Sequence, residues 1–239
     1  MRERLGVRLR RRVNGIIVVV GLVLSLPVVA IVGRIRAGAG RAVARGAVRL
    51  ISRACGISYS VAGLEQLDPD RRYVFVPNHS SPADIPAMLL IRGDVRFVAA
   101  AELFRIPLLN SAMRALGAVP VDRGTPSEAR QRLNVLAQSP SAGSVVVFAE
   151  GGIPRVGEQR RFKSGAFVLA IEAGLAVVPV SIRGSADVLP RGRRIWARPG
   201  RIVIQLHDPI DTSCLTVADR HALRDRTQAA VQAPLAVAA

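Results

Sequence analysis

The chain has 239 residues, of which 50% are hydrophobic and 4% aromatic, and its formal net charge is +17. This length fits one α/β domain or two small ones, and the apolar content exceeds what a soluble core needs. Strongly basic chains often bind nucleic acid, but the globular part has no basic stripe interleaved with stacking residues, so nucleic acid is not expected as a partner. Two cysteines, Cys55 and Cys214, are too few for a disulfide framework and fit a reducing compartment.

The N-terminal quarter combines charge with an apolar segment. Residues 1–64 hold 12 arginines against the single acid Glu3, and the 21 residues between Arg12 and Arg34 are all uncharged. As a helix, this segment would be about 30 Å long, enough to cross a hydrocarbon core or to lie partly embedded in one. Its basic flanks suit anionic lipid head groups, so we expect an anionic membrane as a partner.

Two questions about this segment stay open. A cleaved signal peptide is the rival to a retained anchor, but the stretch is longer than a usual signal core and the cleavage-like triplet at residues 42–44 lies well past its end. We therefore expect a retained anchor. Pro27 leaves open a kinked or re-entrant helix pair instead of a straight span, and arginines on both flanks do not settle the orientation.

The remaining elements follow in chain order. Residues 34–56 predict a basic amphipathic helix lying on the membrane. From Ile57 onward, short β-branched runs alternate with helical stretches, which predicts an α/β sheet with helices on its faces. The expected strands are 57–62, 73–77, 95–99, 118–121, 144–148, 176–182 and 202–206, and the expected helices are 82–91, 102–116, 126–138, 164–173 and 216–231. We divide the chain into an anchor over 1–56, a globular domain over 57–233 and a flexible tail over 234–239.

The stretch Tyr73–Met88 places His79 between a buried strand and a helix start that carries Asp84. In α/β sheets, sites are usually built at this junction, outside the carboxyl end of a strand. In one interpretation, Asp84 only caps its own helix and His79 is an ordinary loop residue. In the other, the Asp84 carboxylate fixes the tautomer of His79 and leaves the second ring nitrogen free to act as a general base.

Three more polar clusters follow strands. Asp122, Arg123 and Gly124 come after 118–121, the residues Glu150 and Gly151 come after 144–148, and a basic loop over 160–163 leads into the helix at 164. A guanidinium such as that of Arg123 suits a phosphate, and so do free N–H groups at a glycine turn. Each cluster alone also has an ordinary surface explanation.

The order of these clusters over residues 73–184 resembles the glycerolipid acyltransferase family, typified by bacterial 1-acyl-glycerol-3-phosphate acyltransferases. Four collinear motifs carry the resemblance. They are N-H-x-S-x-x-D (Asn78, His79, Ser81, Asp84), G-x-[IV]-x-[IV]-D-R (Gly117, Val119, Val121, Asp122, Arg123), part of F-P-E-G-T-R (Phe148, Glu150, Gly151) and V-P-V (Val178, Pro179, Val180). The resemblance implies a mixed, largely parallel sheet flanked by helices and preceded by an N-terminal membrane helix.

Two departures from the family pattern concern cations. Ala100 and Ala101 precede Glu102, where the family usually has a lysine, and Gly152-Ile153 replace the Thr-Arg of the third motif. Two cationic groups expected near the acceptor phosphate are therefore missing. The candidates to replace them are Arg155, Arg160, Arg161 and Lys163; otherwise the acceptor is not lysophosphatidic acid.

The resemblance implies an enzyme that moves a fatty acyl group from an acyl-coenzyme A or acyl-carrier-protein thioester to a lysophospholipid hydroxyl, 1-acyl-glycerol-3-phosphate above all, in phospholipid biosynthesis. His79 and Asp84 would be catalytic, with His79 as general base and no covalent acyl-enzyme. Arg123 would hold the acceptor phosphate. The full set of expected substrate-binding residues is Asn78, Ser81, Arg123, Glu150, Gly151 and Lys163.

No metal or cofactor is expected, because His79, His207 and His221 are scattered and do not make a ligand set. The expected location is the cytoplasmic side of the inner or plasma membrane. The alternatives are an acyltransferase of another lysolipid, an inactive membrane-tethered lipid-binding homologue and a lipid hydrolase in which His79 activates water.

Overall fold

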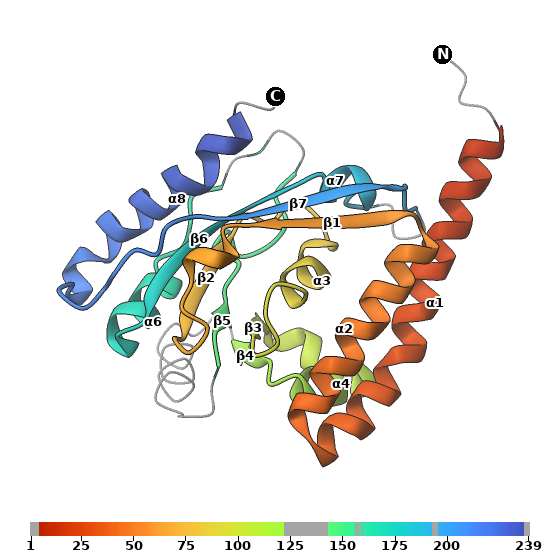
Figure 1. The fold of residues 1–239 in the computed structure, drawn as a ribbon, viewed down its shortest axis with the longest axis horizontal. Helices are drawn as coiled ribbons and strands as arrows, with labels where there is room; N and C mark the ends of the chain where they lie inside the picture. Colours follow the sequence, from red (N-terminus) through yellow and green to blue (C-terminus); the bar gives the residue numbers. More distant parts are fainter. Residues whose placement is uncertain (1–4, 122–142, 156–157, 159, 193–195, 237–239) are drawn as a thin grey trace.

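A seven-stranded sheet forms the centre of the protein (Figure 1). The computed structural model describes residues 5–121, 143–155, 158, 160–192 and 196–236. Its strands run in the order β1-β7-β6-β2-β5-β3-β4, and of these pairs only β6 with β7 is antiparallel, which confirms the mixed, largely parallel sheet. The strands are β1 (Ile57–Ala62), β2 (Tyr73–Pro77), β3 (Arg96–Ala100), β4 (Val119–Val121), β5 (Val145–Val146), β6 (Ala176–Arg183) and β7 (Gly200–Leu206).

The helices agree with the expected ones except at three places. They are α1 (Leu5–Ile35), α2 (Ala37–Ala54), α3 (Asp84–Leu89), α4 (Pro107–Ala115), α6 (Gly165–Ala173), α7 (Ser185–Val188) and α8 (Arg220–Ala236), with 3-10 turns η1 (Leu64–Gln66), η2 (Ala101–Arg105) and η3 (Val217–Asp219). The predicted helix 102–116 is divided into η2 and α4, because Pro107 has no N–H donor and suits a first helical position. Helix α8 continues past Pro234 to Ala236, so the first part of the expected tail is helical. The four-residue α7 was not predicted, since it is too short to show a helical period, and the predicted helix 126–138 lies outside the described residues.

Strand β2 is buried on both faces, as a central parallel strand should be. Phe75 packs in one apolar cluster with Met88 of α3 and with residues of α1, α2 and α4. Val76 points the other way, into a second cluster that contains Phe167 of α6 and residues of α8. The carboxyl end of β2, where His79 follows, is therefore held by packed helices on both faces of the sheet.

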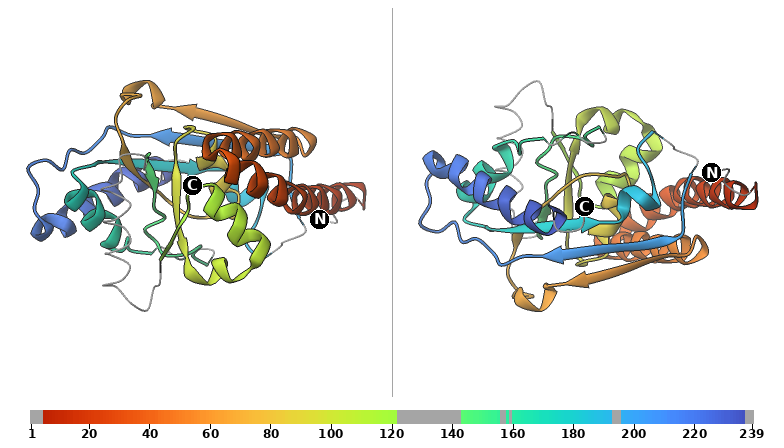
Figure 2. Two further views of the ribbon diagram at one scale, coloured as in Figure 1. Left: turned by 90° about the horizontal axis from the view of Figure 1, so that it is seen from below. Right: turned by 90° about the horizontal axis from the view of Figure 1, so that it is seen from above.

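Helices α1 and α2 form an antiparallel hairpin at the opposite end of the molecule from α8 (Figure 2). Near one end of the hairpin, the Asn14 side-chain amide donates to the Cys55 carbonyl at 3.1 Å, which satisfies a free carbonyl at the end of α2. Near the other end, glycines allow close approach: a Cβ at Gly40 would lie 2.6 Å from the Cα of Gly33, and one at Gly33 would lie 2.5 Å from the Cβ of Ala115 in α4. α1 is thus attached to the rest of the protein at Asn14 and at Gly33.

We expect Gly40→Ala to lower the free energy of unfolding by about 1–3 kcal/mol, because the added methyl forces α1 and α2 apart. Gly46→Ala in the same helix is the matched control, since nothing lies within 4 Å of its Cβ position. That control should raise the free energy of unfolding by about 0.5–1 kcal/mol through helix propensity. Denaturant unfolding in detergent micelles measures both changes, and equal effects of the same sign would contradict the close packing.

Candidate active site

Asn78 fixes the point at which the chain leaves the sheet. Its side-chain amide donates to the Ile182 carbonyl at 3.0 Å, and its carbonyl oxygen accepts the Ile182 N–H at 2.7 Å. The side chain thus continues the ladder between β2 and β6 for one more step after Pro77, which has no N–H to donate. Asn78 holds the backbone from which His79 projects.

His79 is held from three directions. Its backbone N–H donates to Oε1 of Glu150 at 3.0 Å, and its Nδ1 lies 2.9 Å from Oδ2 of Asp84. The imidazole stacks on the Phe148 ring, with 4.1 Å between the ring centroids and 28° between the planes. Its Nε2 has no hydrogen-bond partner in the part of the chain that the structure describes, and the side chain is 11% exposed. One ring nitrogen is therefore committed and the other is available to a ligand.

Asp84 fixes the tautomer of His79. Its Oδ2 accepts the backbone N–H groups of Ser80 and Ser81, both at 2.8 Å, in addition to the bond with His79, and the side chain is completely buried. An oxygen that already accepts two N–H groups is a carboxylate acceptor, so Nδ1 of His79 carries the hydrogen and Nε2 presents its lone pair. Asp84 therefore does more than cap its own helix: its carboxylate bonds the turn before α3 and the imidazole of His79 together.

The two serines of this turn hold it in place. Ser81 is completely buried, and its hydroxyl donates to the Leu189 carbonyl at 2.7 Å and accepts the Ala83 N–H at 3.0 Å. Ser80 shares a 3.0 Å hydroxyl–hydroxyl bond with Ser185, the first residue of α7. The Ser81 hydroxyl thus donates one bond and accepts one bond inside the protein, and Ser81 is not among the residues that line the pocket described below. Ser185 of α7 and Leu189, the residue after α7, thus support the turn from 105 and 108 positions further along the chain.

Glu150 lies against His79 and is 9% exposed. Besides the bond from the His79 N–H to Oε1, its other oxygen, Oε2, is buried and has no hydrogen-bond partner among the described residues. Burial raises the pKa of this carboxyl, while the hydrogen bond from His79 works in the opposite direction. A buried carboxyl with a free oxygen beside a histidine is typical of a functional site.

The raised pKa of Glu150 predicts a pH dependence of stability. The folded protein binds the Glu150 proton more tightly than the unfolded chain, so ionisation of this group favours unfolding. Compared with Glu150→Gln, wild-type protein should therefore lose stability as the pH rises from about 4.3, the ordinary glutamate value, through the raised folded value. Denaturant unfolding of both proteins over that range measures the difference, and a difference that stays flat or grows in favour of the wild type would contradict the assignment.

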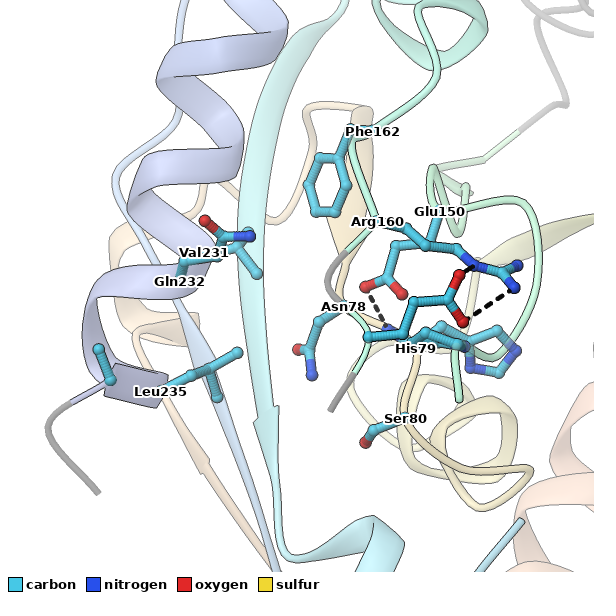
Figure 3. Close-up of a pocket in the computed structure, with 12 residues that line it drawn as sticks. Asn78, His79, Ser80, Glu150, Arg160, Phe162, Val231, Gln232 and Leu235 are labelled. Atoms are coloured by element: carbon cyan, nitrogen blue, oxygen red, sulfur yellow. Dashed lines mark hydrogen bonds and ion pairs between the residues drawn. The ribbon is translucent and has the colours of Figure 1, made fainter. Parts of the chain in front are cut away.

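A pocket of about 390 Å³ opens beside these groups (Figure 3). Its polar side is formed by Asn78, His79, Ser80 and Glu150, with the pair Glu158 and Arg160 at the edge. The other side comes from Pro154, Phe162, Val231, Leu235 and their neighbours, and α8 supplies most of this wall. A polar floor that contains a histidine base and an apolar wall suit a ligand with a reactive head and a hydrocarbon tail.

Comparison with known proteins agrees with this arrangement. The model of the family described as Acyltransferase matches residues 58–183, which is more than half of the chain and contains the His79–Asp84 pair. This chain belongs to the Acyltransferase family.

Other members show the same likeness. The chain is 33% identical over 156 residues to the chloroplastic 1-acyl-sn-glycerol-3-phosphate acyltransferase of Arabidopsis thaliana, a match that covers 64% of this chain and 44% of that protein. It is 30% identical over 173 residues to the mouse 1-acyl-sn-glycerol-3-phosphate acyltransferase alpha, a match that covers 71% of this chain and 61% of that protein. The crystal structure of the 1-acyl-sn-glycerophosphate (LPA) acyltransferase PlsC from Thermotoga maritima superposes with a TM-score of 0.69 at 25% identity, over 89% of this chain and 92% of that one. The chain thus spans less than half the length of its plant relative but nearly all of the bacterial structure.

The structure brings most of the sequence-predicted residues of this acyltransferase site together. Asn78, His79 and Glu150 line the pocket, while Arg123 lies outside the described residues. Gly151 has a φ of +73° and contacts Lys163, whose Nζ lies 2.9 Å from the position a Cβ would take at Gly151. The positive φ favours glycine here, because a side chain would strain the backbone and would also require the end of Lys163 to move.

Three contributions to the site were missed. The Phe148 ring was matched to a motif but not expected to stack on His79, and an aromatic residue two positions before Glu150 was the available signal. Ser185 and the apolar residues of α8 had no such signal, because only tertiary contacts bring them to His79.

Proposed function

We propose that this protein transfers a fatty acyl group from a coenzyme A or acyl-carrier-protein thioester to the free hydroxyl of 1-acyl-glycerol-3-phosphate at a membrane surface. The observation that carries the proposal is the His79–Asp84 pair, with Nε2 of His79 unbonded at the floor of a pocket whose opposite wall is apolar. Family membership and the names of the relatives support the reaction and the acceptor.

In the proposed reaction, Nε2 of His79 takes the proton of the acceptor hydroxyl as its oxygen attacks the thioester carbonyl. The C–O bond forms, the C–S bond breaks, and the proton passes from the imidazolium to the departing thiolate. The Asp84 carboxylate at 2.9 Å stabilises the imidazolium that exists in between. Cys55 and Cys214 do not line the pocket, so direct transfer without an acyl-cysteine fits the described residues.

We also propose that α1 associates with a membrane. Among the described residues, α1 is the one helix that is both long enough and apolar enough to cross a bilayer. Only 17% of its most apolar 18-residue stretch is buried in the protein. Its exposed apolar side chains are between 41% and 84% accessible, including Leu9, Ile16, Leu24, Ile31 and Ile35. A contiguous apolar surface of this kind, flanked by arginines at both ends, suits an anionic bilayer.

The packing of α1 favours a position along the membrane rather than across it. Arg11 and Asn14 contact the loop at Ala197 and the end of α2, while Gly33 packs on α4, so the helix is attached to the domain near both ends. A helix that crossed the bilayer would carry these contacts into the lipid with it. The proposed location is the cytoplasmic side, where both types of thioester donor are available.

Flotation with phosphatidylglycerol vesicles tests the membrane association. Leu24 is 66% exposed and Ile31 is 63% exposed, so replacing both with glutamate removes apolar contact without disturbing the core. The double variant should stay with the unbound fraction, because buried apolar area provides much of the binding free energy. Ala229→Glu on the exposed face of α8 is the control and should float like the wild type. Equal flotation of all three proteins would contradict the proposed surface.

Analysis of products from a labelled acyl thioester tests the reaction. Membranes that carry the protein are given acyl-coenzyme A or acyl carrier protein, with and without a panel of lysolipids. Acceptor-dependent formation of diacylglycerol phosphate supports the proposal. Free fatty acid alone would identify a hydrolase, a product with another lysolipid would identify a different acceptor, and no product at all would leave a lipid-binding protein.

A further inference from the structure

The structure distinguishes among the four cationic residues that could bind an acceptor phosphate. Arg161 pairs with Asp225 of α8 at 3.2 Å and is 68% exposed, outside the pocket. Lys163 packs against Gly151, and the Arg155 side chain does not line the pocket. Of these four, Arg160 alone lines the pocket with His79 and Glu150.

Arg160 lies beside the glycine turn that follows Glu150. Its Nη1 lies 3.8 Å from the position that a Cβ would take at Gly152, so the guanidinium rests against the turn that follows Glu150. The peptide that carries Arg160 is fixed from α8, where the Gln228 side chain bonds both the Arg160 carbonyl and the Phe162 N–H. The backbone of Arg160 is therefore held while its side chain extends toward the pocket (Figure 3).

The Glu158 carboxylate is hydrogen-bonded to the Arg160 guanidinium. Nε of Arg160 donates to Oε1 at 2.7 Å and a terminal nitrogen donates to Oε2 at 3.3 Å, the two-bond arrangement that a phosphate also uses. These bonds, together with the Arg155 N–H, lower the pKa of Glu158 to about 2, so it is an anion at any physiological pH. The pair is more than one-third exposed on both sides, and an exposed ion pair of this type is weak.

We propose that Arg160 binds the acceptor phosphate in place of the cations missing from the family motifs, and that this phosphate displaces Glu158 from the Arg160 guanidinium. A phosphomonoester carries more charge than a carboxylate and presents three oxygens to the same planar donor set. Glu158 thus acts as a resident competitor that holds Arg160 in place and disfavours acceptors without a phosphate. The inference rests on the proposed function, because it assumes a phosphorylated acceptor.

Steady-state kinetics of the full-length protein in mixed micelles test the proposal, with 1-acyl-glycerol-3-phosphate as acceptor. Arg160→Gln should raise the KM for this acceptor by about 10- to 100-fold with a much smaller change in kcat, since a charge-assisted bidentate contact is lost. Glu158→Gln should lower the same KM by about 2- to 5-fold, because it removes the competing carboxylate. Arg161→Gln, one residue along and outside the pocket, is the matched control and should leave the KM unchanged.

Glycerol 3-phosphate and glycerol provide a second measurement that does not need turnover. Glycerol 3-phosphate should raise the thermal unfolding temperature of the wild type more than glycerol does, and Arg160→Gln should remove that difference. If the wild type acylates the acceptor but Arg160→Gln keeps its KM, the phosphate subsite is wrong and the transferase function stands. If no acceptor is acylated yet the Arg160-dependent stabilisation persists, the subsite stands and the function fails. Should Arg160→Gln not fold, an unchanged or raised KM in Glu158→Gln overturns the proposal.

Discussion

Replacing His79 with glutamine should lower kcat for acyl transfer by about 10²- to 10⁴-fold, the contribution usual for a positioned general base. Glutamine fills similar space and retains a group that can bond Asp84, but no atom at the Nε2 position can take a proton at neutral pH. The backbone N–H that bonds Glu150 is unaffected by the substitution. The KM for the acceptor should therefore change far less than kcat.

Transfer from labelled acyl-coenzyme A to 1-acyl-glycerol-3-phosphate, in membranes with equal amounts of protein, measures this effect. His221→Gln is the matched control, because His221 is an exposed histidine near the start of α8 and does not line the pocket. That variant should transfer at the wild-type rate. Wild-type turnover by the His79 variant would rule out the assigned base and leave the pocket without a catalytic group among the described residues.

Replacing Asp84 with asparagine should affect both catalysis and stability. The buried Oδ2 accepts three hydrogen bonds, and a neutral amide accepts them more weakly or turns its NH₂ group toward two backbone donors. We expect the free energy of unfolding to fall by about 1.5–3 kcal/mol, the value for hydrogen bonds to a charged group. We also expect kcat to fall by about 100-fold or more, because the imidazolium loses its counter-charge and Nδ1–H its fixed partner.

Asp219→Asn separates these two effects. Asp219 also accepts a backbone N–H and a hydroxyl hydrogen, both from Thr216, but it caps η3 far from the pocket. Its asparagine variant should lose about 0.5–2 kcal/mol of stability and keep the wild-type kcat. Denaturant unfolding and the transfer assay on both variants make the comparison. Parallel losses of kcat in the two variants would show that Asp84 acts only through stability.

Different parts of the chain supply the His79–Asp84 pair, which is proposed to perform the chemistry, and Arg160, which is proposed to recognise the acceptor. His79 and Asp84 lie five positions apart in a stretch that ends at the first residue of α3. Arg160 instead lies against the turn after Glu150, and Gln228 of α8 holds its backbone. Substitutions at the pair are therefore expected to act on kcat and substitutions at Arg160 on KM.

The sequence by itself determined the features that depend on local interactions. Strands such as Tyr73–Pro77 are β-branched and apolar on both faces, and the spacing of His79 and Asp84 is short enough for the residues between them to form a single turn, so both were predictable. Only the tertiary structure decided which residues complete the site. Ser185 and the Leu189 carbonyl hold the turn after His79 from more than 100 positions away. Residues of α8 line the pocket, and Arg160 lines it while Arg155, Arg161 and Lys163 do not. The physical reason is that these residues reach the site through the hydrophobic packing of α6, α7 and α8 on the sheet. Packing against a distant strand leaves no pattern in the local sequence that would identify the residues in contact with the site.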